Sequence, residues 1–141
     1  AIAYAQDGVP IGAAIATRTG VPGERQRLSL AHELGHLVLK VDEGLDEEKI
    51  AFRFGGAFLI PAETLFGEIG PRRVDISLEE LILLKQRYGM SIQALLYRMR
   101  ILGVISGAYY TQWMQNLSRQ GWRKHEPNEL PEEAPQRFRQ L

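Results

Sequence analysis

The pattern of apolar and polar residues at the start of the chain predicts a short antiparallel hairpin. Residues 2–5 and 10–15 form two short, mostly apolar runs, and Asp7-Gly8 between them is a favoured turn dipeptide. Pro10 stands at the start of the second run, where a strand tolerates the missing N–H group. We therefore expect two strands, followed by a loop at residues 19–23.

The next part of the chain has the spacing of a helix. From Glu24 or Arg25 onward, apolar residues recur every three or four positions, so that one helix face would collect Leu30, Leu34, Leu37 and Val38. This helix should end no later than Gly44, because glycine favours a helix stop.

A second helix is expected at residues 46–58. Its first turn carries three carboxylates, which suit the positive end of the helix dipole, at Asp46, Glu47 and Glu48. Its core face would consist of Ile50, Phe54 and Ala57 or Phe58. Gly55-Gly56 would weaken this helix in isolation, so close packing against another element is the expected reason for the pair.

Glycine, proline and serine residues at helix starts and stops predict four further helices, at residues 62–69, 77–88, 92–102 and 106–120. Ser77 and Glu80 form a capping-box pattern, and Ser91 is a second N-cap. After Trp122, three prolines favour an extended tail over the surface. Together the elements predict an α+β fold, in which a small antiparallel sheet and a helix pair occupy residues 1–75. A helical subdomain with the tail would occupy residues 76–141.

The composition is that of a globular protein with no membrane-spanning segment. Hydrophobic residues make up 45% of the 141 residues, which is ordinary for a protein with a core. No apolar run is long enough to cross a bilayer, and no signal peptide is visible. The chain has no cysteine, so disulfides are excluded and a reducing, cytoplasmic setting is expected. Because the chain begins at Ala1 rather than Met, we expect an upstream segment to be missing.

The net charge of zero conceals two segments of opposite charge. Residues 42–80 contain ten acidic and four basic residues, whereas residues 81–125 contain seven basic residues and no acidic one. Residues 77–105 also resemble a helix-turn-helix, so this basic segment could contact nucleic acid. We favour a helical subdomain that packs on the rest of the protein, because several leucines demand burial: Leu81, Leu84, Leu95, Leu96 and Leu102. We also expect core positions for Tyr109, Tyr110 and Trp113.

The sequence His32-Glu33-Leu34-Gly35-His36 carries the candidate chemistry. On a helix, His32 and His36 project from one face, and this spacing around a glutamate is the signature of zinc metallopeptidases. Glu33 would act as general base on a zinc-activated water. Gly35 has no side chain, which would let another backbone or a substrate come close. A catalytic zinc needs three protein ligands, so one ligand remains to be found.

The third ligand must come from a limited set. There is no cysteine, and the one remaining histidine is His125. Glu48 is favoured, because it precedes Ala51 and Gly55 on a face of small residues that could pack near the motif helix. From the residues alone, Glu47 and Asp46 remain open as alternatives.

Several segments resemble the ImmA/IrrE family of metallopeptidases. They are the run from Arg27 to His36, Glu48-Lys49-Ile50-Ala51-Phe52-Arg53-Phe54-Gly55, Leu59-Ile60-Pro61, residues 84–95, Gly121-Trp122-Arg123, Glu126-Pro127 and Pro135-Gln136-Arg137-Phe138. Leu28, Ser29 and Gly55 depart mildly from the family's aromatic residue, threonine and alanine at those positions.

This resemblance implies a cytoplasmic, zinc-dependent endopeptidase with a zincin-like core. His32, His36 and Glu48 would be the Zn²⁺ ligands, and Glu33 would be the catalytic base. The implied substrate is a helix-turn-helix transcriptional repressor, whose cleavage relieves repression in mobile elements or stress responses. Members are often encoded beside, or fused to, such a regulator, so the missing upstream segment could be an N-terminal regulator domain.

A different class of function is a regulatory DNA- or protein-binding module whose peptidase fold is vestigial. Within the peptidase hypothesis, the hairpin either offers an edge strand to a peptide substrate or has a purely structural role. An oxyanion stabiliser should exist, and the sequence leaves its candidates unranked: Tyr88, Tyr97, Arg98 and His125.

Overall fold

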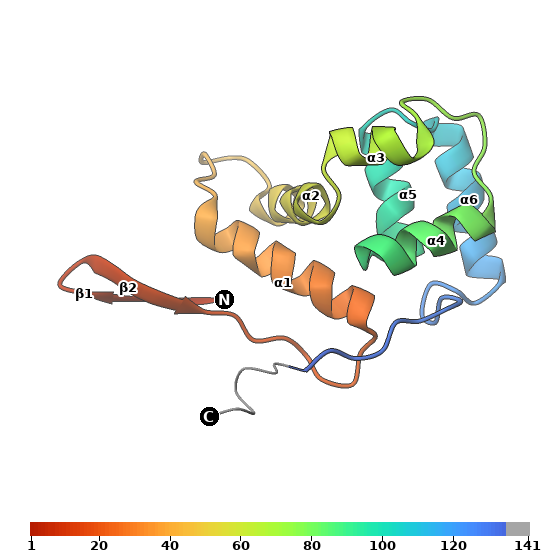
Figure 1. Ribbon diagram of the computed structural model, residues 1–141. Coiled ribbons are helices and arrows are strands. Elements are labelled where there is room, and N and C mark those ends of the chain that lie inside the picture. The colour runs from red at the N-terminus through yellow and green to blue at the C-terminus, as the bar shows by residue number, and fades with distance from the viewer. Residues whose placement is uncertain (135–141) are drawn as a thin grey trace.

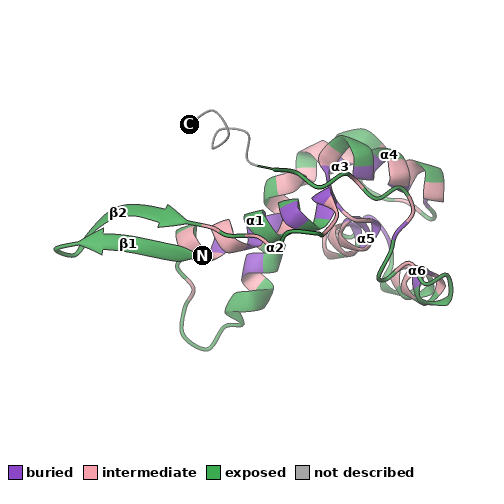
Figure 2. Cartoon of the chain, turned by 90° about the horizontal axis from the view of Figure 1, so that it is seen from below, coloured by how far each residue is buried: buried purple, intermediate pink, exposed green. Residues whose placement is uncertain are grey.

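The computed structural model of the protein describes residues 1–134, which form a two-stranded hairpin and six helices. The hairpin pairs β1 (Ile2–Gln6) with β2 (Val9–Ala14) in antiparallel order. Asp7 and Gly8 form the turn, and both have positive φ angles. The hairpin projects away from the helices (Figure 1), and every residue of both strands is exposed (Figure 2). The mixed content of strands and helices confirms the predicted α+β class.

Helix α1 (Gly23–Val38) carries the histidine motif, and its buried face differs from the predicted one. Of the four residues of the predicted apolar face, Leu30 and Val38 are 41% and 58% exposed, and Leu34 and Leu37 are half-buried. The buried positions are Gly23, Glu24, Gln26, Ala31, His32 and Gly35. Ala31, His32 and Gly35 lie against α2. Glu24 and Gln26 are buried instead by their contacts with Lys85 of α4 and with Glu133 of the tail.

Helix α2 (Glu47–Leu59) packs against α1. Its most buried residues are again small ones and not the predicted large apolar ones. Its buried residues are Ala51, Gly55 and Gly56, whereas Phe58 is 59% exposed and the predicted core residues Ile50 and Phe54 are only half-buried. The predicted reason for the glycine pair is confirmed at Gly55. A Cβ atom there would lie 3.3 Å from the backbone nitrogen of His32.

Four more helices complete the fold: α3 (Ala62–Ile69), α4 (Leu78–Tyr88), α5 (Ile92–Ile101) and α6 (Gly107–Arg119). The Ser77–Glu80 capping box is present at α4, and Ser91 caps α5 by accepting from the amide of Ala94. Gly89 ends α4 in the left-handed conformation, with φ 65°. For these four helices the predicted and observed limits agree to within about two residues.

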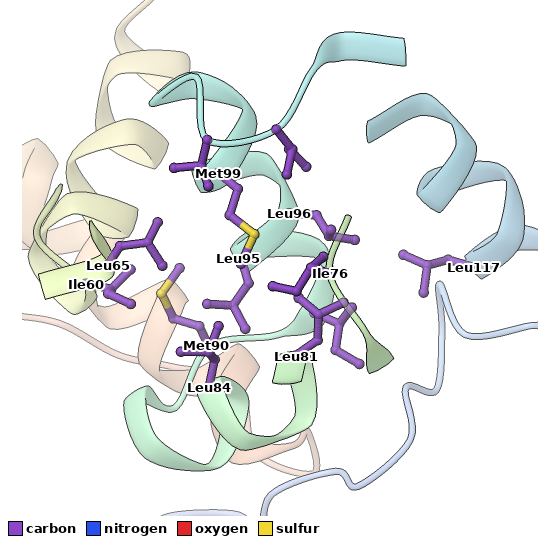
Figure 3. Packing of buried hydrophobic residues seen from close by; sticks show 13 residues of the cluster. Ile60, Leu65, Ile76, Leu81, Leu84, Met90, Leu95, Leu96, Met99 and Leu117 are labelled. Carbon is purple, nitrogen blue, oxygen red and sulfur yellow. The ribbon is translucent and has the colours of Figure 1, made fainter. Parts of the chain in front are cut away.

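The hydrophobic core lies among α3, α4, α5 and α6 (Figure 3). As predicted, Leu81, Leu84, Leu95 and Leu96 are buried, whereas Leu102 is only partly buried. The aromatic residues of α6 are half-buried and pack against the core's margin: Tyr109, Tyr110 and Trp113. The predicted boundary at residue 75 remains a prediction. Residues on both sides of it, such as Ile60 and Leu81, belong to this one core.

The tail after Trp122 returns to the first turns of α1 without forming a helix or strand from residue 126 to 134. The amide of Gly23 donates to the carbonyl of Leu130 at 3.1 Å, and the amide of Glu133 donates to the side chain of Gln26 at 2.7 Å. Figure 1 shows this blue segment passing beneath α1. The part of the family resemblance at Pro135-Gln136-Arg137-Phe138 lies outside the described residues.

A buried ion cluster joins the tail, α1 and α4. Lys85 of α4 is fully buried, and its ammonium group lies 2.8 Å from a carboxylate oxygen of Glu24 and 3.0 Å from one of Glu126. Glu126 also accepts from the amides of Ile92 and Gln93 at the start of α5. These charges are therefore paired and hydrogen-bonded, as buried charges must be.

No single helix in the described part of the chain is long and apolar enough to cross a membrane. Helices α2 and α3 together meet the length and composition criteria, but they are bent by 54° at the break between them.

Candidate metal centre

The two motif histidines point their Nε2 atoms toward one another from a single face of α1. His32 and His36 are one helical turn apart, and their Nε2 atoms are separated by 3.1 Å. The side chain of His32 is 10% exposed and that of His36 is 20% exposed. The structure therefore brings together two imidazole nitrogens that can bind one ion.

Glu48, in the first turn of α2, completes this group. One of its carboxylate oxygens lies 3.1 Å from Nε2 of His32, and the other lies 2.9 Å from Nε2 of His36. Ligand atoms of the three residues all lie within 4.8 Å of one another. Two imidazoles and one carboxylate form a donor set that suits Zn²⁺ and leaves a position for water. The residues therefore fit a metal ion by their chemistry and their convergence.

The two other acidic residues considered as third ligands have different contacts. The carboxylate of Asp46 accepts from the amide of Lys49 at 3.0 Å and so caps α2. Oε1 of Glu47 lies 3.2 Å from Nδ1 of His36, on the opposite side of the imidazole ring from Glu48. Among these three acids, the geometry favours Glu48 as the ligand.

Small residues let α1 and α2 approach closely enough for this geometry. A Cβ atom at Gly35 would lie 3.4 Å from Cα of Ala51, and one at Gly55 would lie 3.3 Å from the backbone of His32. These pairings show that the helices run antiparallel. The first turn of α2 is therefore opposite the last turn of α1, where His36 lies.

The surroundings of His32 differ from those of His36. Nδ1 of His32 is buried with no hydrogen-bond partner among the described residues, whereas Nδ1 of His36 faces Glu47. The ring of Phe52 packs on His32, with ring centroids 4.0 Å apart. Packing therefore orients one imidazole, and a carboxylate orients the other.

Glu33 follows His32 on α1, and its carboxylate accepts a hydrogen bond from the α-ammonium group of Ala1. This hydrogen bond is the main cause that lowers the pKa of the Glu33 carboxyl. Desolvation opposes that effect, while the charge of the ammonium group and the two motif histidines add to it. An ionised carboxylate beside the histidine pair is the form that a general base requires.

The four candidate oxyanion stabilisers fall into two groups. The hydroxyl of Tyr88 donates to Glu68 at 2.7 Å, which raises the pKa of Tyr88, and His125 contacts Glu129 on the exposed tail. Tyr97 and Arg98 instead line a groove beside α2. The role of oxyanion stabiliser stays unassigned.

Three basic side chains of residues 81–125 have partners within the protein. Lys85 is buried, Arg87 pairs with Glu68 at 3.0 Å, and Arg100 lies over the ring of Tyr110 at 5.1 Å. Contact with nucleic acid through residues 81–125 stays a prediction.

Comparison with protein families gives one match. The family model described as the IrrE N-terminal-like domain, a peptidase family, matches residues 12–100. The chain belongs to this family. The IrrE-like match covers α1 to α5 and includes the whole candidate metal centre, which confirms the resemblance seen in the sequence. No curated protein and no solved structure matches the chain. Membership supports a metallopeptidase type of function, and the group of His32, His36 and Glu48 could hold its metal.

Two features of this IrrE-like site were missed from the sequence. The first is the contact of Glu47 with His36, and the second is the packing of Phe52 on His32. The four-residue spacing of Glu48 and Phe52 was a partial signal for the second feature. It places Phe52 one helical turn after Glu48, on the same face of α2.

Proposed function

We propose that this protein is a zinc-dependent endopeptidase that cleaves a helix-turn-helix transcriptional repressor. The observation that carries the proposal is the convergence of Nε2 of His32, Nε2 of His36 and the carboxylate of Glu48 beside Glu33. Membership of the IrrE-like peptidase family supports the same reaction class.

His32, His36 and Glu48 would hold the metal. Zinc, when bound, supplies the Lewis acidity that makes water nucleophilic at neutral pH and polarises a peptide carbonyl. Glu47 would keep the His36 ring in the orientation that presents Nε2, because a carboxylate at Nδ1 fixes the imidazole tautomer.

Glu33 would move the protons. It accepts a proton from the water whose oxygen attacks the peptide carbonyl carbon, and it delivers that proton to the leaving nitrogen as the C–N bond breaks. One carboxylate thus serves both halves of hydrolysis.

The choice of a repressor as substrate rests on the family resemblance. Relief of repression in a stress response or a mobile element would then be the biological outcome, and the cytoplasm would be the setting. The hairpin is compatible with strand addition by an extended substrate, since both of its strands are exposed and β1 begins beside Glu33.

Metal analysis followed by a Glu33→Gln variant tests this function. The purified protein should bind zinc in a one-to-one ratio. Glu33→Gln should keep this zinc and should lower the cleavage of a helix-turn-helix regulator encoded beside this chain by at least about a hundredfold. The assay follows the loss of intact regulator and maps the cut by mass spectrometry.

Glu43→Gln is the matched control, because Glu43 is an exposed carboxylate in the loop between α1 and α2. The Glu43→Gln variant should cleave the regulator as fast as the unmodified protein does. Absence of zinc affinity would favour the other candidate, a DNA- or protein-binding module with a vestigial peptidase fold. Unchanged cleavage by Glu33→Gln would remove Glu33 from its role.

A further inference from the structure

A groove of about 690 Å³ lies beside the helix pair α1 and α2, and its lining does not include the three candidate metal ligands. Leu28 of α1 and Phe52 and Gly56 of α2 line it, and helices α5 and α6 close its other side. Leu28 is one turn before His32 on α1, and Phe52 is one turn after Glu48 on α2. The seam between the two helices therefore carries the metal centre and the groove one after the other.

Phe52 joins the two parts of this seam. Its ring packs on His32, with centroids 4.0 Å apart, and the same side chain is 50% exposed and lines the groove. A chain bound with one peptide carbonyl at the metal centre would therefore pass over Phe52 and continue into the groove.

The lining of the groove is strongly cationic. Five basic side chains surround it, at Arg25, Lys49, Arg53, Arg98 and Arg123. The one carboxylate in the lining belongs to Asp46, which already caps α2. Within residues 1–134, none of the five basic side chains forms an ion pair. Arg25 also donates to the backbone carbonyl of Lys124 at 2.6 Å, which leaves its charge unneutralised. All five cations can therefore attract an anionic ligand.

Two of these cations repel one another. Burial lowers the pKa of the Arg98 guanidinium, and the positive charge of Arg53 lowers it further. Arg98 is anchored where it lies, since its Nε donates to the carbonyl oxygen of Ile60 at 3.2 Å. A carboxylate bound near Arg53 and Arg98 would relieve this repulsion.

The remaining surface of the groove is apolar and aromatic, with Met90, Tyr97, Ile101, Tyr110 and Met114 in the lining. Such a surface suits the apolar side chains of a peptide, and methionine adapts to side chains of different shapes. A nucleic acid would use the cations but not this apolar lining, because phosphate contacts dominate its binding.

We propose that this groove binds an acidic, amphipathic segment of the protein substrate next to the bond that is cut. The inference rests on the proposed peptidase function and names the chemistry that selects the substrate. Carboxylates of the segment pair with the five cations, and its apolar residues cover the methionines and tyrosines.

The test separates binding from hydrolysis. The probe for binding is a pool of proteome-derived peptides, passed over the immobilised, metal-free full chain, and the retained peptides are sequenced by mass spectrometry. They should be richer in Asp and Glu than the input. The double variant Lys49→Gln, Arg53→Gln should retain acidic peptides about tenfold less well, because it removes two exposed cations of the groove.

Arg119→Gln, Lys124→Gln is the matched control, because it removes the same charge from exposed residues outside the groove. It should retain acidic peptides like the unmodified chain. The inference is overturned if retention shows no acidic bias, or if both double variants lose it equally. It is also overturned if a single-stranded oligonucleotide binds in the groove and the peptides do not.

The same pool is then given to the zinc-loaded protein. Cleaved peptides should carry acidic residues on one side of the cut, and the groove variant should lose this preference while still cutting. Cleavage without an acidic preference refutes the inference and leaves the peptidase function standing. Retention of acidic peptides without any cleavage supports the groove and refutes the peptidase function.

Discussion

Oε1 of Glu47 lies 3.2 Å from Nδ1 of His36, whereas its neighbour Glu48 reaches Nε2 of the same ring at 2.9 Å. Two adjacent carboxylates thus contact opposite nitrogens of one imidazole. The helix makes this possible, because successive residues in the first turn of α2 point about 100° apart around its axis. One acid can then bind the metal while the other holds its histidine ligand in place.

Substitution of these two acids should have unequal effects on zinc affinity. Glu48→Gln removes an anionic ligand and should leave zinc bound only weakly. Glu47→Gln removes an orienting contact and should weaken zinc binding about 10- to 100-fold. Competition with a chromophoric chelator measures both affinities, with Glu43→Gln as the control. The reverse order of effects would mean that Glu47, not Glu48, is the ligand.

The close contact of α1 with α2 should make Gly55 sensitive to a single methyl group. Alanine normally stabilises a helix interior by about 1 kcal/mol relative to glycine. At Gly55 the added Cβ would lie 3.3 Å from the backbone nitrogen of His32, so this gain should be lost and zinc affinity should fall. Gly67→Ala is the control, since nothing lies within 4 Å of its Cβ position in α3. Urea denaturation compares the two variants, and equal stabilisation by both would contradict the close packing.

Lys85→Met should strongly destabilise the fold. The substitution keeps much of the side-chain volume but leaves Glu24 and Glu126 buried without their cation. Breaking a buried ion pair on one side typically costs about 3–5 kcal/mol. The expected result is a large drop in the urea midpoint. Lys124→Met, at an exposed position, should leave the midpoint nearly unchanged, and a similar result for Lys85→Met would show that the cluster contributes little.

The capping box of α4 should make stability depend on pH. The pKa of Glu80 is lowered from its model-compound value of 4.5, chiefly because its carboxylate accepts from the backbone amide of Ser77, with a further contribution from Arg73. Since the folded-state pKa is the lower one, the stabilisation is present above pH 4.5 and is lost as the pH falls through the folded-state value.

Glu80→Gln should therefore unfold more easily than the unmodified protein at pH 7, by up to about 1 kcal/mol because solvent screens the pair. The difference should shrink below pH 4.5. Thermal denaturation across this range provides the measurement, and Glu79→Gln, exposed on the same turn, is the control. A difference that stays constant with pH would assign the effect to side-chain shape and not to charge.

The limits of most helices could be predicted because they depend on local chemistry. Helix caps form between residues only three positions apart, as at Ser77, Glu80 and Ser91. Such short-range contacts can be predicted from the sequence. The arrangement of His32, Glu33 and His36 could also be predicted from local geometry. Helical periodicity alone places the two histidines on one face.

The buried faces of α1 and α2 could not be predicted in the same way. A periodic run that includes Leu30 and Val38 is typical of a core stripe, yet these side chains are exposed. Glycines and alanines contribute little to a hydrophobic pattern, although they permit the closest helix contact.

The sequence by itself determined the candidate metal-binding motif. The spacing of His32, Glu33 and His36 indicates two metal ligands and a base, because a helix has one fixed periodicity. The residues alone left Glu47 open beside Glu48, and the tertiary structure brings Glu48 to both Nε2 atoms, since that contact depends on how α2 is turned against α1. The groove likewise arises only in the folded chain, which assembles Arg25, Arg53, Arg98 and Arg123 from distant segments. Contacts within one helix follow from the order of residues, whereas contacts between helices depend on their packing.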